Sequence, residues 1–560
     1  MVDRKRQAVI WVAVAAVLGL AGCSSSGLEA RTELGASAVG TQGMVSSAHP
    51  LATQVGVDVL EAGGNAFDAA VAVAAALNVV EPMMSGIGGY GTILVHVASE
   101  DQTLFLNPSG RIPAAVNSDL FRAPTPNYEE NRRGAKAVST PGNVGAWESM
   151  HFRYGSLEWA ELFDPAIALA EDGFILGEWT AGVIEWAWED FPYHARAFYG
   201  ANGRPLEVGE RLVQEDLARS FRLIAEQGAH AVNGGELGRA IDAAMTKAGG
   251  FLSLEDLEDN EAEWWEPIAI EYRGYEIRTA SAPANAFPAL VRLGMMGEYD
   301  VQAMGHNTVP FLHRYAEVTK HAFWTRLRYA GDPDVNPPPM DMLLSEGYWE
   351  EQVAAIDTVQ ATVFEPPTQF SDGTMHTTHF VVADQWGNVV SATQTLGNAF
   401  GSRIMPEGTG IWLNNSLAYC TFEPAGNPMD AHAGRRKLSG DVPVIVMREG
   451  KPWIALGTPG GHTIGQTVPQ MLMNMIDFDM NVQAALTAGR VSFVEPNWLA
   501  VEETIPEEVR QALEAMGHEV RPVGGLGNAH GLTIEYGEDG KPVRFSGGAD
   551  PRGDGLAQGY

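Results

Sequence analysis

The stretch from residue 376 to residue 395 constrains the fold more than any other part of the chain. Two runs rich in β-branched residues flank a short loop, 384–388, which contains Gly, and this pattern predicts a β-hairpin. If the loop is centred on Trp386, the register brings Thr377 directly opposite Thr395. Directly opposed residues share a face of a sheet and lie within side-chain reach. The sequence therefore predicts two threonine side chains in contact at the open end of a hairpin.

The position of Thr377 gives that contact a chemical meaning. A Thr hydroxyl is a poor nucleophile until a neighbouring base takes its proton, but a Thr at a chain terminus can use its own α-amine as that base. The preceding region, 357–376, is rich in Thr, Pro, Ser, Gln, Asp and Gly, a composition typical of a linker. This linker runs directly into a hydrophobic strand. Such a junction is unusual unless cleavage there frees the start of the strand.

Charge and cysteine content exclude several classes of partner. The 560-residue chain carries 70 acidic and 36 basic residues, a formal net charge of -34, which argues against nucleic acid or an anionic membrane surface as a partner. Only two cysteines are present, and we interpret Cys420 as a core or wall residue rather than a nucleophile. Without an intramolecular disulfide, the protein must be stabilised by its core.

The N-terminal segment has the features of an export signal. Basic residues at 4–6 precede an apolar run, 8–20, that is too short to span a bilayer, so we interpret residues 1–22 as a secretory signal peptide. Small residues immediately before Cys23 resemble the bacterial lipobox, which implies a lipidated Cys23 and a flexible tether over residues 23–45. The expected localisation is the periplasm, with a membrane anchor through Cys23. An ordinary signal peptide that happens to contain Cys is the alternative.

Hydrophobic periodicity predicts the main elements of the chain. Helices are expected over 51–60 and 66–80, the second apolar almost all round and therefore buried. A strand is expected over 409–413, and a second hairpin over 442–456. Amphipathic helices dominate the middle region, 140–355.

Two glycine-rich turns have different contexts. The turn 457–461 follows a strand and precedes a helix, the arrangement in which backbone N–H groups converge on an anion. It lacks the Lys-Ser/Thr of a phosphate loop, so an oxyanion hole and a plain tight turn both remain open. The turn 86–91 fits G-x-G-x-x-G but follows a helix and precedes a strand, the reverse of a dinucleotide site. Close backbone packing is expected there.

Other common catalytic motifs do not fit the chain. His376 and His379 are three residues apart on a predicted strand and point to opposite faces, so no metal site is expected. Neither G-x-S-x-G nor H-E-x-x-H occurs in the sequence. Arg111, between a Gly and an Ile-Pro pair, is suited to gripping a carboxylate, although a solvated loop Arg is the alternative.

Several motifs, in order along nearly the whole chain, resemble the γ-glutamyltranspeptidase family. They lie at 56–60, 63–70, 377–382, 413–415, 457–461 and 549–552. The resemblance implies an α+β fold, the four-layer αββα sandwich of the N-terminal-nucleophile hydrolases, made as a precursor that cuts itself between His376 and Thr377. The products would be a large subunit, 46–376, and a small subunit, 377–560, which form a heterodimer and together one composite domain.

The resemblance also implies roles for individual residues. Thr377 would be the nucleophile and its new α-amine the general base, while Thr395 hydrogen-bonds to the nucleophile. The backbone amides of Gly460 and Gly461 would stabilise the oxyanion. An acyl-Thr377 ester would form from a small-molecule amide and be resolved by water or an amine, with no cofactor.

The sequence departs from the family pattern mostly where the substrate head group should bind. The family Arg slot corresponds to Ser109, with Arg111 displaced by two, and the Gln and Asp that read the α-amino group correspond to Ser416 and Tyr419. The paired serines that grip the carboxylate become Ser439-Gly440, and an Asn two residues after the second Thr becomes Gly397. We therefore take Arg111, Ser416 and Ser439 as the substrate-binding candidates.

Three functions follow from this pattern. The leading hypothesis is an amidase or acylase with an acyl group other than γ-glutamyl, as in the glutaryl-type cephalosporin acylases of the family. An authentic glutathione hydrolase or γ-glutamyltransferase with a rearranged clamp is the first alternative. The second, from another class, is a non-catalytic lipoprotein scaffold, which predicts an uncut chain.

Overall fold

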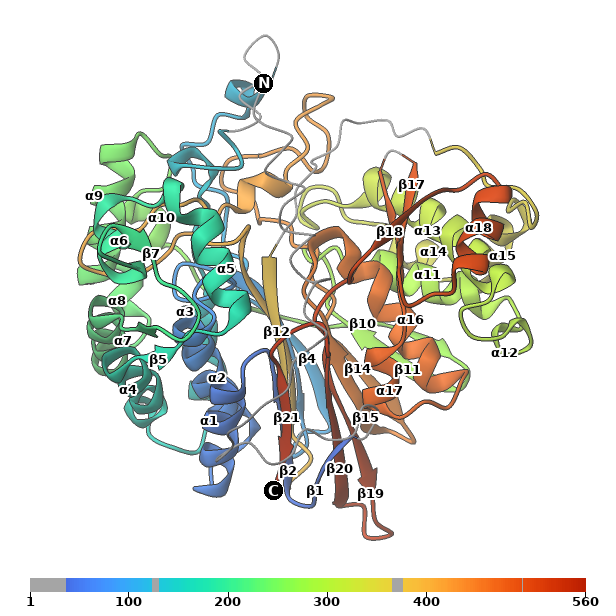
Figure 1. The fold of residues 1–560 in the computed structure, drawn as a ribbon, viewed down its shortest axis with the longest axis horizontal. Coiled ribbons are helices and arrows are strands. Elements are labelled where there is room, and N and C mark those ends of the chain that lie inside the picture. Colours follow the sequence, from blue (N-terminus) through green and yellow to red (C-terminus); the bar gives the residue numbers. More distant parts are fainter. Residues whose placement is uncertain (1–36, 123–129, 365–375, 496) are drawn as a thin grey trace.

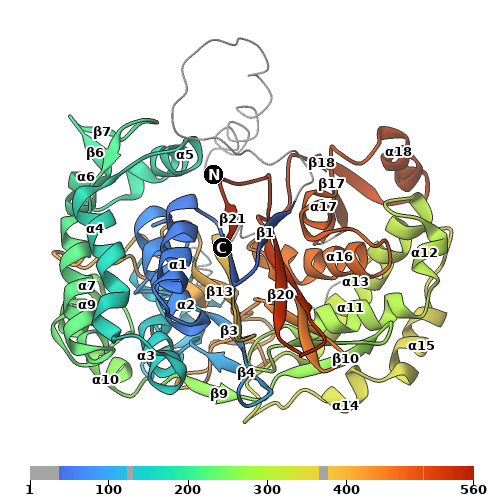
Figure 2. The same ribbon diagram turned by 90° about the horizontal axis from the view of Figure 1, so that it is seen from below.

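Two seven-stranded sheets lie face to face at the centre of the molecule, and helices cover the outer face of each (Figures 1 and 2). The computed structural model describes residues 37–122, 130–364, 376–495 and 497–560. This arrangement confirms the αββα sandwich expected from the resemblance. The predicted signal peptide, Cys23 and most of the linker before His376 lie outside the described residues.

Strands that precede and follow residue 377 pair with one another in both sheets. The first sheet runs β1 (Ala38–Gly40), β20 (Pro542–Ala549), β19 (His530–Tyr536), β15 (Lys451–Gly457), β14 (Val444–Arg448), β11 (Tyr275–Thr279), β10 (Ile268–Tyr272). The second runs β21 (Leu556–Gly559), β2 (Gly43–Ser47), β12 (His376–Asp384), β13 (Val389–Gly397), β3 (Tyr90–Val97), β4 (Gln102–Asn107), β9 (Glu263–Trp265). Thus β12 pairs with β2, β13 with β3, and β20 with β1, all antiparallel.

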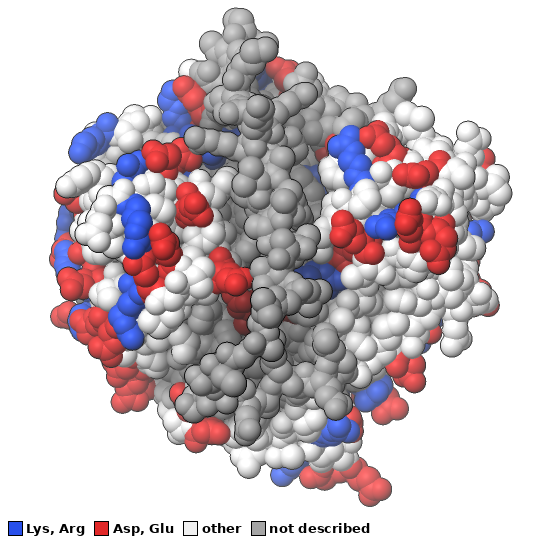
Figure 3. Space-filling model, viewed as in Figure 1, with Lys and Arg blue, Asp and Glu red and all other residues white. Residues whose placement is uncertain are grey.

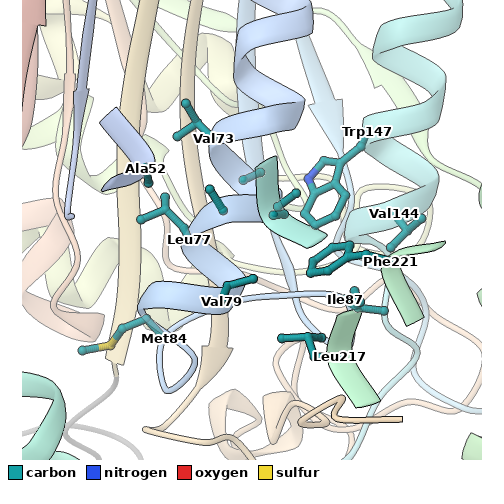
Figure 4. Close-up of a cluster of buried hydrophobic side chains, with 14 of the residues drawn as sticks. Ala52, Val73, Leu77, Val79, Met84, Ile87, Val144, Trp147, Leu217 and Phe221 are labelled. Atoms are coloured by element: carbon teal, nitrogen blue, oxygen red, sulfur yellow. The ribbon is translucent and has the colours of Figure 1, made fainter. Parts of the chain in front are cut away.

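One helical layer packs on the second sheet. Its helices are α1 (Pro50–Glu61), α2 (Ala66–Val80), α3 (Asn143–Tyr154), α4 (Asp164–Asp172), α5 (Glu178–Ala187), α6 (Tyr193–Tyr199), α7 (Glu215–Gln227), α8 (His230–Asn233), α9 (Glu236–Ala248) and α10 (Leu254–Glu258). Every residue of α2 is buried, as the sequence predicts, and Asn65 and Asp68 form a capping box that starts it at Ala66. Figure 4 shows Val73 and Leu77 of α2 in the same cluster as Trp147 of α3 and Phe221 of α7.

The other helical layer covers the first sheet. It contains α11 (Phe287–Gly297), α12 (Val301–Met304), α13 (Val309–Tyr329), α14 (Met340–Leu343), α15 (Glu346–Ala354), α16 (Ile464–Ile476), α17 (Val482–Thr487) and α18 (Glu507–Ala515). A small sheet beside it consists of β16 (Val491–Val494), β17 (Trp498–Glu502) and β18 (Glu519–Val523). Within the described ranges, none of the helices is long and apolar enough to cross a membrane. On the face shown in Figure 3, acidic side chains lie on both sides, with Lys and Arg among them.

The predicted strand at 409–413 is wrong. The segment forms no strand, because its backbone groups bond to loops instead: Leu413 N donates to Ile404 O at 3.0 Å, and Leu413 O accepts from Ser402 N at 2.8 Å. Gly408 and Gly410, with φ of 77° and 66°, turn the chain on both sides of Thr409. The β-branched and aromatic residues here are buried by packing rather than by a sheet ladder.

His530 of β19 is completely buried between the two sheets, where its Nδ1 lies 3.2 Å from Ser46 Oγ. Burial lowers the pKa of His530 to about 4, and it lowers the pKa of the nearby His379 well below its usual range. Because the unfolded chain binds a proton at His530 near pH 6.5 and the folded chain does not, the free energy of unfolding falls as the pH drops from about 6.5 toward 4.

His530→Gln should therefore weaken the acid sensitivity of the fold. Urea titrations at pH 7 and pH 5 should show a loss of unfolding free energy that is smaller in the variant by about 2 kcal/mol. The exposed His230→Gln controls for the removal of an imidazole. Buried carboxyl groups contribute equally to both proteins. If wild type and His530→Gln lost the same unfolding free energy between pH 7 and pH 5, the role of His530 in the acid sensitivity would be contradicted.

Candidate active site

The hairpin formed by β12 and β13 has the predicted register. Thr377 is directly opposite Thr395, and Thr377 Oγ1 donates a hydrogen bond to Thr395 Oγ1 at 3.1 Å. Both side chains are buried, with exposures of 1% and 0%. The two threonines are thus held in contact at the open end of the hairpin, where β12 begins at His376.

Thr395 also contacts the peptide bond that precedes Thr377. Its Oγ1 donates to His376 O at 2.7 Å and accepts from Gly397 N at 2.8 Å. Because a carbonyl oxygen only accepts, the hydroxyl proton of Thr395 must point at His376 O, and the bond from Thr377 occupies a lone pair. The pairing register shifts between His376 and Thr377. The carbonyl that Thr377 would attack during self-cleavage is therefore already polarised by a hydroxyl.

Strand β12, which carries Thr377, faces the other sheet. Thr377, His379 and Val381 alternate along β12 on the face that contributes to the core between the sheets. The ring of His379 lies against Gly457, the last residue of β15, where an added Cβ would come within 2.4 Å of His379 Cε1. Glycine is therefore required at this contact, which brings the start of the glycine-rich turn against β12.

The turn 457–461 leads through a 3₁₀ turn (Gly461–Thr463) into α16. Gly460 and Gly461 have φ of 134° and 59°, values that favour glycine. Thr458 Oγ1 accepts from Asn528 N at 3.2 Å, which ties the turn to the segment before β19. The context of strand, turn and helix N-terminus is the one predicted, and the oxyanion role of the Gly460 and Gly461 amides stays a prediction.

The other glycine-rich turn is a site of close backbone packing, as predicted. Added Cβ atoms at Gly88, Gly89 and Gly91 would lie 2.2 to 2.5 Å from backbone carbonyl oxygens, including Thr395 O and Thr393 O. These glycines let the start of β3 and the preceding turn approach β13. The turn therefore supports the strand that carries Thr395.

Arg111 does not enter the space between the sheets. Its side chain is 46% exposed, pairs with Glu263 at 3.1 Å and donates to Gly434 O at 3.2 Å. Its substrate-binding role stays a prediction. Ser109, in the slot of the family Arg, is buried and donates to Gly91 O at 3.0 Å.

The other substrate-binding candidates are buried and already bonded. Ser416 Oγ lies 2.5 Å from Ser139 Oγ, and Ser439 Oγ lies 2.9 Å from Thr92 Oγ1 on β3. Tyr419 follows Ser416, and its ring has an edge contact with His462, at 6.1 Å between centroids. Three uncharged side chains, two hydroxyls and a phenol, thus stand where the resemblance expects an amide, an acid and a serine.

Sequence reasoning missed three buried groups beside these candidates: Lys437, Asp441 and Tyr90. Lys437 follows two arginines, so the local pattern indicates a solvated basic run. Tyr90 opposes Thr395 on β3, in a stretch that the sequence marks only as the start of a strand. Which of three successive basic side chains turns inward depends on long-range packing, so no local signal identifies Lys437.

One group of side chains within the described ranges has the proximity of metal ligands: His313, Glu317 and His518. His313 Nδ1 lies 2.8 Å from His518 Nε2, and Glu317 accepts from Lys320 Nζ at 2.6 Å. The carboxylate of Glu317 is thus paired with Lys320. The contact between the two imidazoles links α13 to the residues after α18. It is remote in sequence from the threonine pair.

Comparisons with known proteins match most of the length of the chain. The family model described as gamma-glutamyltranspeptidase matches residues 52–560. The chain is 36% identical to the Acylase ACY 1 proenzyme of Pseudomonas sp. (strain V22), over 91% of this chain and 95% of that protein. It is 33% identical to the glutathione hydrolase proenzyme of Bacillus subtilis (strain 168), over 93% and 92%. The cephalosporin acylase structure from Bacillus halodurans superposes with a TM-score of 0.87 and 30% identity, covering 97% of this chain and 99% of that one.

Proposed function

The chain belongs to the γ-glutamyltranspeptidase family, and from that premise we propose that it is a self-processing acylase or amidase with an acyl group other than γ-glutamyl. It is an enzyme of the N-terminal-nucleophile type. The relatives' names, proenzymes of acylases and glutathione hydrolases, support a precursor that becomes a heterodimer and acts on an amide.

The proposed reaction follows from the geometry at Thr377. In the uncut chain, Thr377 Oγ attacks the His376 carbonyl carbon, and Thr395 stabilises the oxyanion through the bond it already makes. Collapse of this intermediate breaks the C–N bond between His376 and Thr377, the hydroxyl proton passes to the leaving nitrogen, and an ester on Thr377 Oγ remains. Water then hydrolyses the ester, which releases His376 as a carboxylate and leaves Thr377 with a free α-amine. In turnover that amine takes the proton of Thr377 Oγ as it attacks a substrate amide, and passes it to the leaving amine. Water or another amine then resolves the acyl ester.

The choice of acyl group rests on one observation: position 419 holds a tyrosine, where the family has an aspartate. In the family, an Asp in this place pairs with the α-ammonium of a γ-glutamyl group, a charge-assisted contact. Here the phenol of Tyr419 replaces it, and Ser416 is bonded to Ser139. Losing such a contact should weaken recognition of the amine by about 10-fold or more.

The test compares γ-glutamyl and glutaryl p-nitroanilides on one processed preparation. The two acyl groups differ only in the α-amine, so the ratio of their kcat/KM values isolates that group. We expect glutaryl to be preferred by about 10-fold or more. A clear preference for γ-glutamyl would overturn this proposal in favour of glutathione hydrolase activity, and an uncut chain without turnover would favour the scaffold.

We also propose that the protein is an exported lipoprotein that lies in the periplasm and is anchored to a membrane through a lipidated Cys23. The charged start, the apolar run and the small residues before Cys23 support this. Cys23→Ser should move the protein from the membrane fraction to the soluble fraction, while Cys420→Ser should not. A membrane-bound Cys23→Ser variant would contradict the anchor.

A further inference from the structure

Four buried polar atoms beside the threonine pair have no hydrogen-bond partner among the residues that the structure describes: Lys437 Nζ, Tyr90 Oη, Tyr419 Oη and Asp441 Oδ1. The side chains are 1%, 0%, 8% and 1% exposed. An unpaired buried polar atom costs free energy comparable to a lost hydrogen bond, and the cost is larger for a charged group. Four such atoms in one place indicate a site that is completed by a polar ligand. We call these four residues the Lys437 cluster.

The Lys437 cluster lies next to the nucleophile. Tyr90 is the register partner of Thr395, and Thr395 is the register partner of Thr377, so the three share one face of the second sheet. Lys437 Nζ lies 2.7 Å from the centroid of the Tyr90 ring and 5.4 Å from that of Tyr419. From β12 to β3 the sheet spans two strand spacings, about 10 Å. A short acyl chain on Thr377 can lie across this distance toward Lys437.

Lys437 is the basic side chain of its segment that turns inward. The neighbouring Arg436 pairs with Glu263 at 2.6 Å and with Asp332 at 3.1 Å, and Arg111 pairs with the same Glu263. Lys437 has no ion pair at all within the part of the chain that the structure describes. Burial lowers the pKa of Lys437 well below its usual range, because only the more distant Asp441 and Cys420 favour its charge. An anion brought to Nζ would restore that charge and gain an ion pair.

We propose that Lys437 is a specificity-determining residue, whose ammonium binds the distal carboxylate of a short dicarboxylic acyl group, such as glutaryl, carried on Thr377. This inference rests on the proposed function and names its substrate class. Lys437 then takes over carboxylate recognition from the family Arg slot, which Ser109 occupies here without a charge.

The rest of the cluster suits this ligand. The Tyr90 ring holds the ammonium by a cation–π contact, and the hydroxyl of Tyr419 is a donor for the second carboxylate oxygen. Asp441 accepts from Thr92 Oγ1 at 3.3 Å, and its carboxylate favours the charged form of Lys437. An α-ammonium on the acyl group would add a second cation near Lys437, which favours an acyl chain without one.

The experiment measures two p-nitroanilides, glutaryl and pentanoyl, which differ only in the distal carboxylate. We expect processed wild-type enzyme to prefer glutaryl, and Lys437→Met to lose about 10-fold or more of kcat/KM on glutaryl, chiefly through KM. Pentanoyl turnover should stay within about 2-fold, and Lys437→Arg should retain part of the preference. Inhibition by free glutarate should weaken in parallel in Lys437→Met. Equal losses on both anilides, or an unchanged preference, would overturn the proposal.

Arg403 provides a matched control. It is another buried cation, 6% exposed, stacked on Trp186 at 4.7 Å with an unpaired Nη1. Arg403→Met should keep the preference for glutaryl. If Arg403→Met lost that preference and Lys437→Met kept it, the assignment to Lys437 would be overturned. The two products of self-cleavage on a denaturing gel show that each variant has folded. If Lys437→Met remains uncut, Lys437→Gln is measured in its place, with the same expected result.

Failure of this proposal differs from failure of the proposed function. A wild-type enzyme indifferent to the distal carboxylate would overturn the role of Lys437 and leave an acylase for uncharged groups. A wild-type preference for γ-glutamyl would overturn the proposed function alone, because that group has the same distal carboxylate. Lys437→Met would then be judged on γ-glutamyl against 4-aminobutanoyl p-nitroanilide, which lacks it.

Discussion

Thr377→Ala should leave a single uncut chain and no measurable turnover. The substitution removes the hydroxyl that we propose attacks the His376 carbonyl, and without cleavage there is no free α-amine at position 377. We expect amidase activity to fall by at least about 10⁴-fold, as for loss of a nucleophile that acts together with its base. A denaturing gel of purified protein and an anilide assay measure the two effects separately.

Thr378→Ala is the matched control for Thr377→Ala. Thr378 is equally buried, but as the next residue of β12 it points to the opposite face of the sheet. Its variant should still be cut, and Thr377→Ser should be cut as well because it keeps a hydroxyl. Two bands from Thr377→Ala would show that cleavage lies elsewhere and would remove the basis for the assigned nucleophile.

Thr395→Val should fold but cut itself slowly. Valine keeps the β-branched shape, which suits a central strand, and removes the hydroxyl that donates to His376 O. Loss of one donor to a developing oxyanion costs about 10² to 10³ in rate. The Gly397 N–H also loses its acceptor, which should lower the free energy of unfolding by about 1 to 3 kcal/mol. The half-life of the uncut band after synthesis measures the rate.

Thr393→Val tests whether the effect is specific to that hydroxyl. Thr393 lies on the same strand and the same face, and its Oγ1 lies 2.8 Å from His379 Nδ1 rather than near the peptide bond between His376 and Thr377. Its variant should be cut within a few-fold of the wild-type rate. Cleavage of Thr395→Val at the wild-type rate would mean that the bond to His376 O has no catalytic role.

The centre of the site could be predicted from local sequence because a hairpin register is a local property. Once the loop is centred on Trp386, counting residues outward pairs Thr377 with Thr395, and the structure has that pair. The helix at 66–80 was equally accessible, since its cap and its apolar body are contiguous in sequence. Both elements are specified by residues that are close together in the sequence, so they can be predicted without knowledge of the tertiary contacts.

The errors and omissions arise where long-range packing decides. The residues at 409–413 have the composition of a strand, but their backbone partners are loop residues close in sequence. The inward turn of Lys437 depends on Tyr90, which is more than three hundred residues away in the chain. The local sequence of Arg111 suits it to hold an anion, and its pairing with Glu263 on β9 is a long-range contact that the sequence does not indicate. None of these pairings leaves a local pattern.

The pairing of strands across residue 377 decides what cleavage does to the assembly. Strand β12 lies between β2 and β13, and β20 lies between β1 and β19. The two products therefore cannot dissociate without breaking the backbone hydrogen bonds between strands in both sheets. Separation is therefore equivalent to unfolding, and activity should not fall on dilution as it does for a reversible dimer. Loop closure along the intact chain brings the strands together, and cutting then removes that tether. Subunits separated by a denaturant should therefore reassemble less efficiently than the uncut precursor folds.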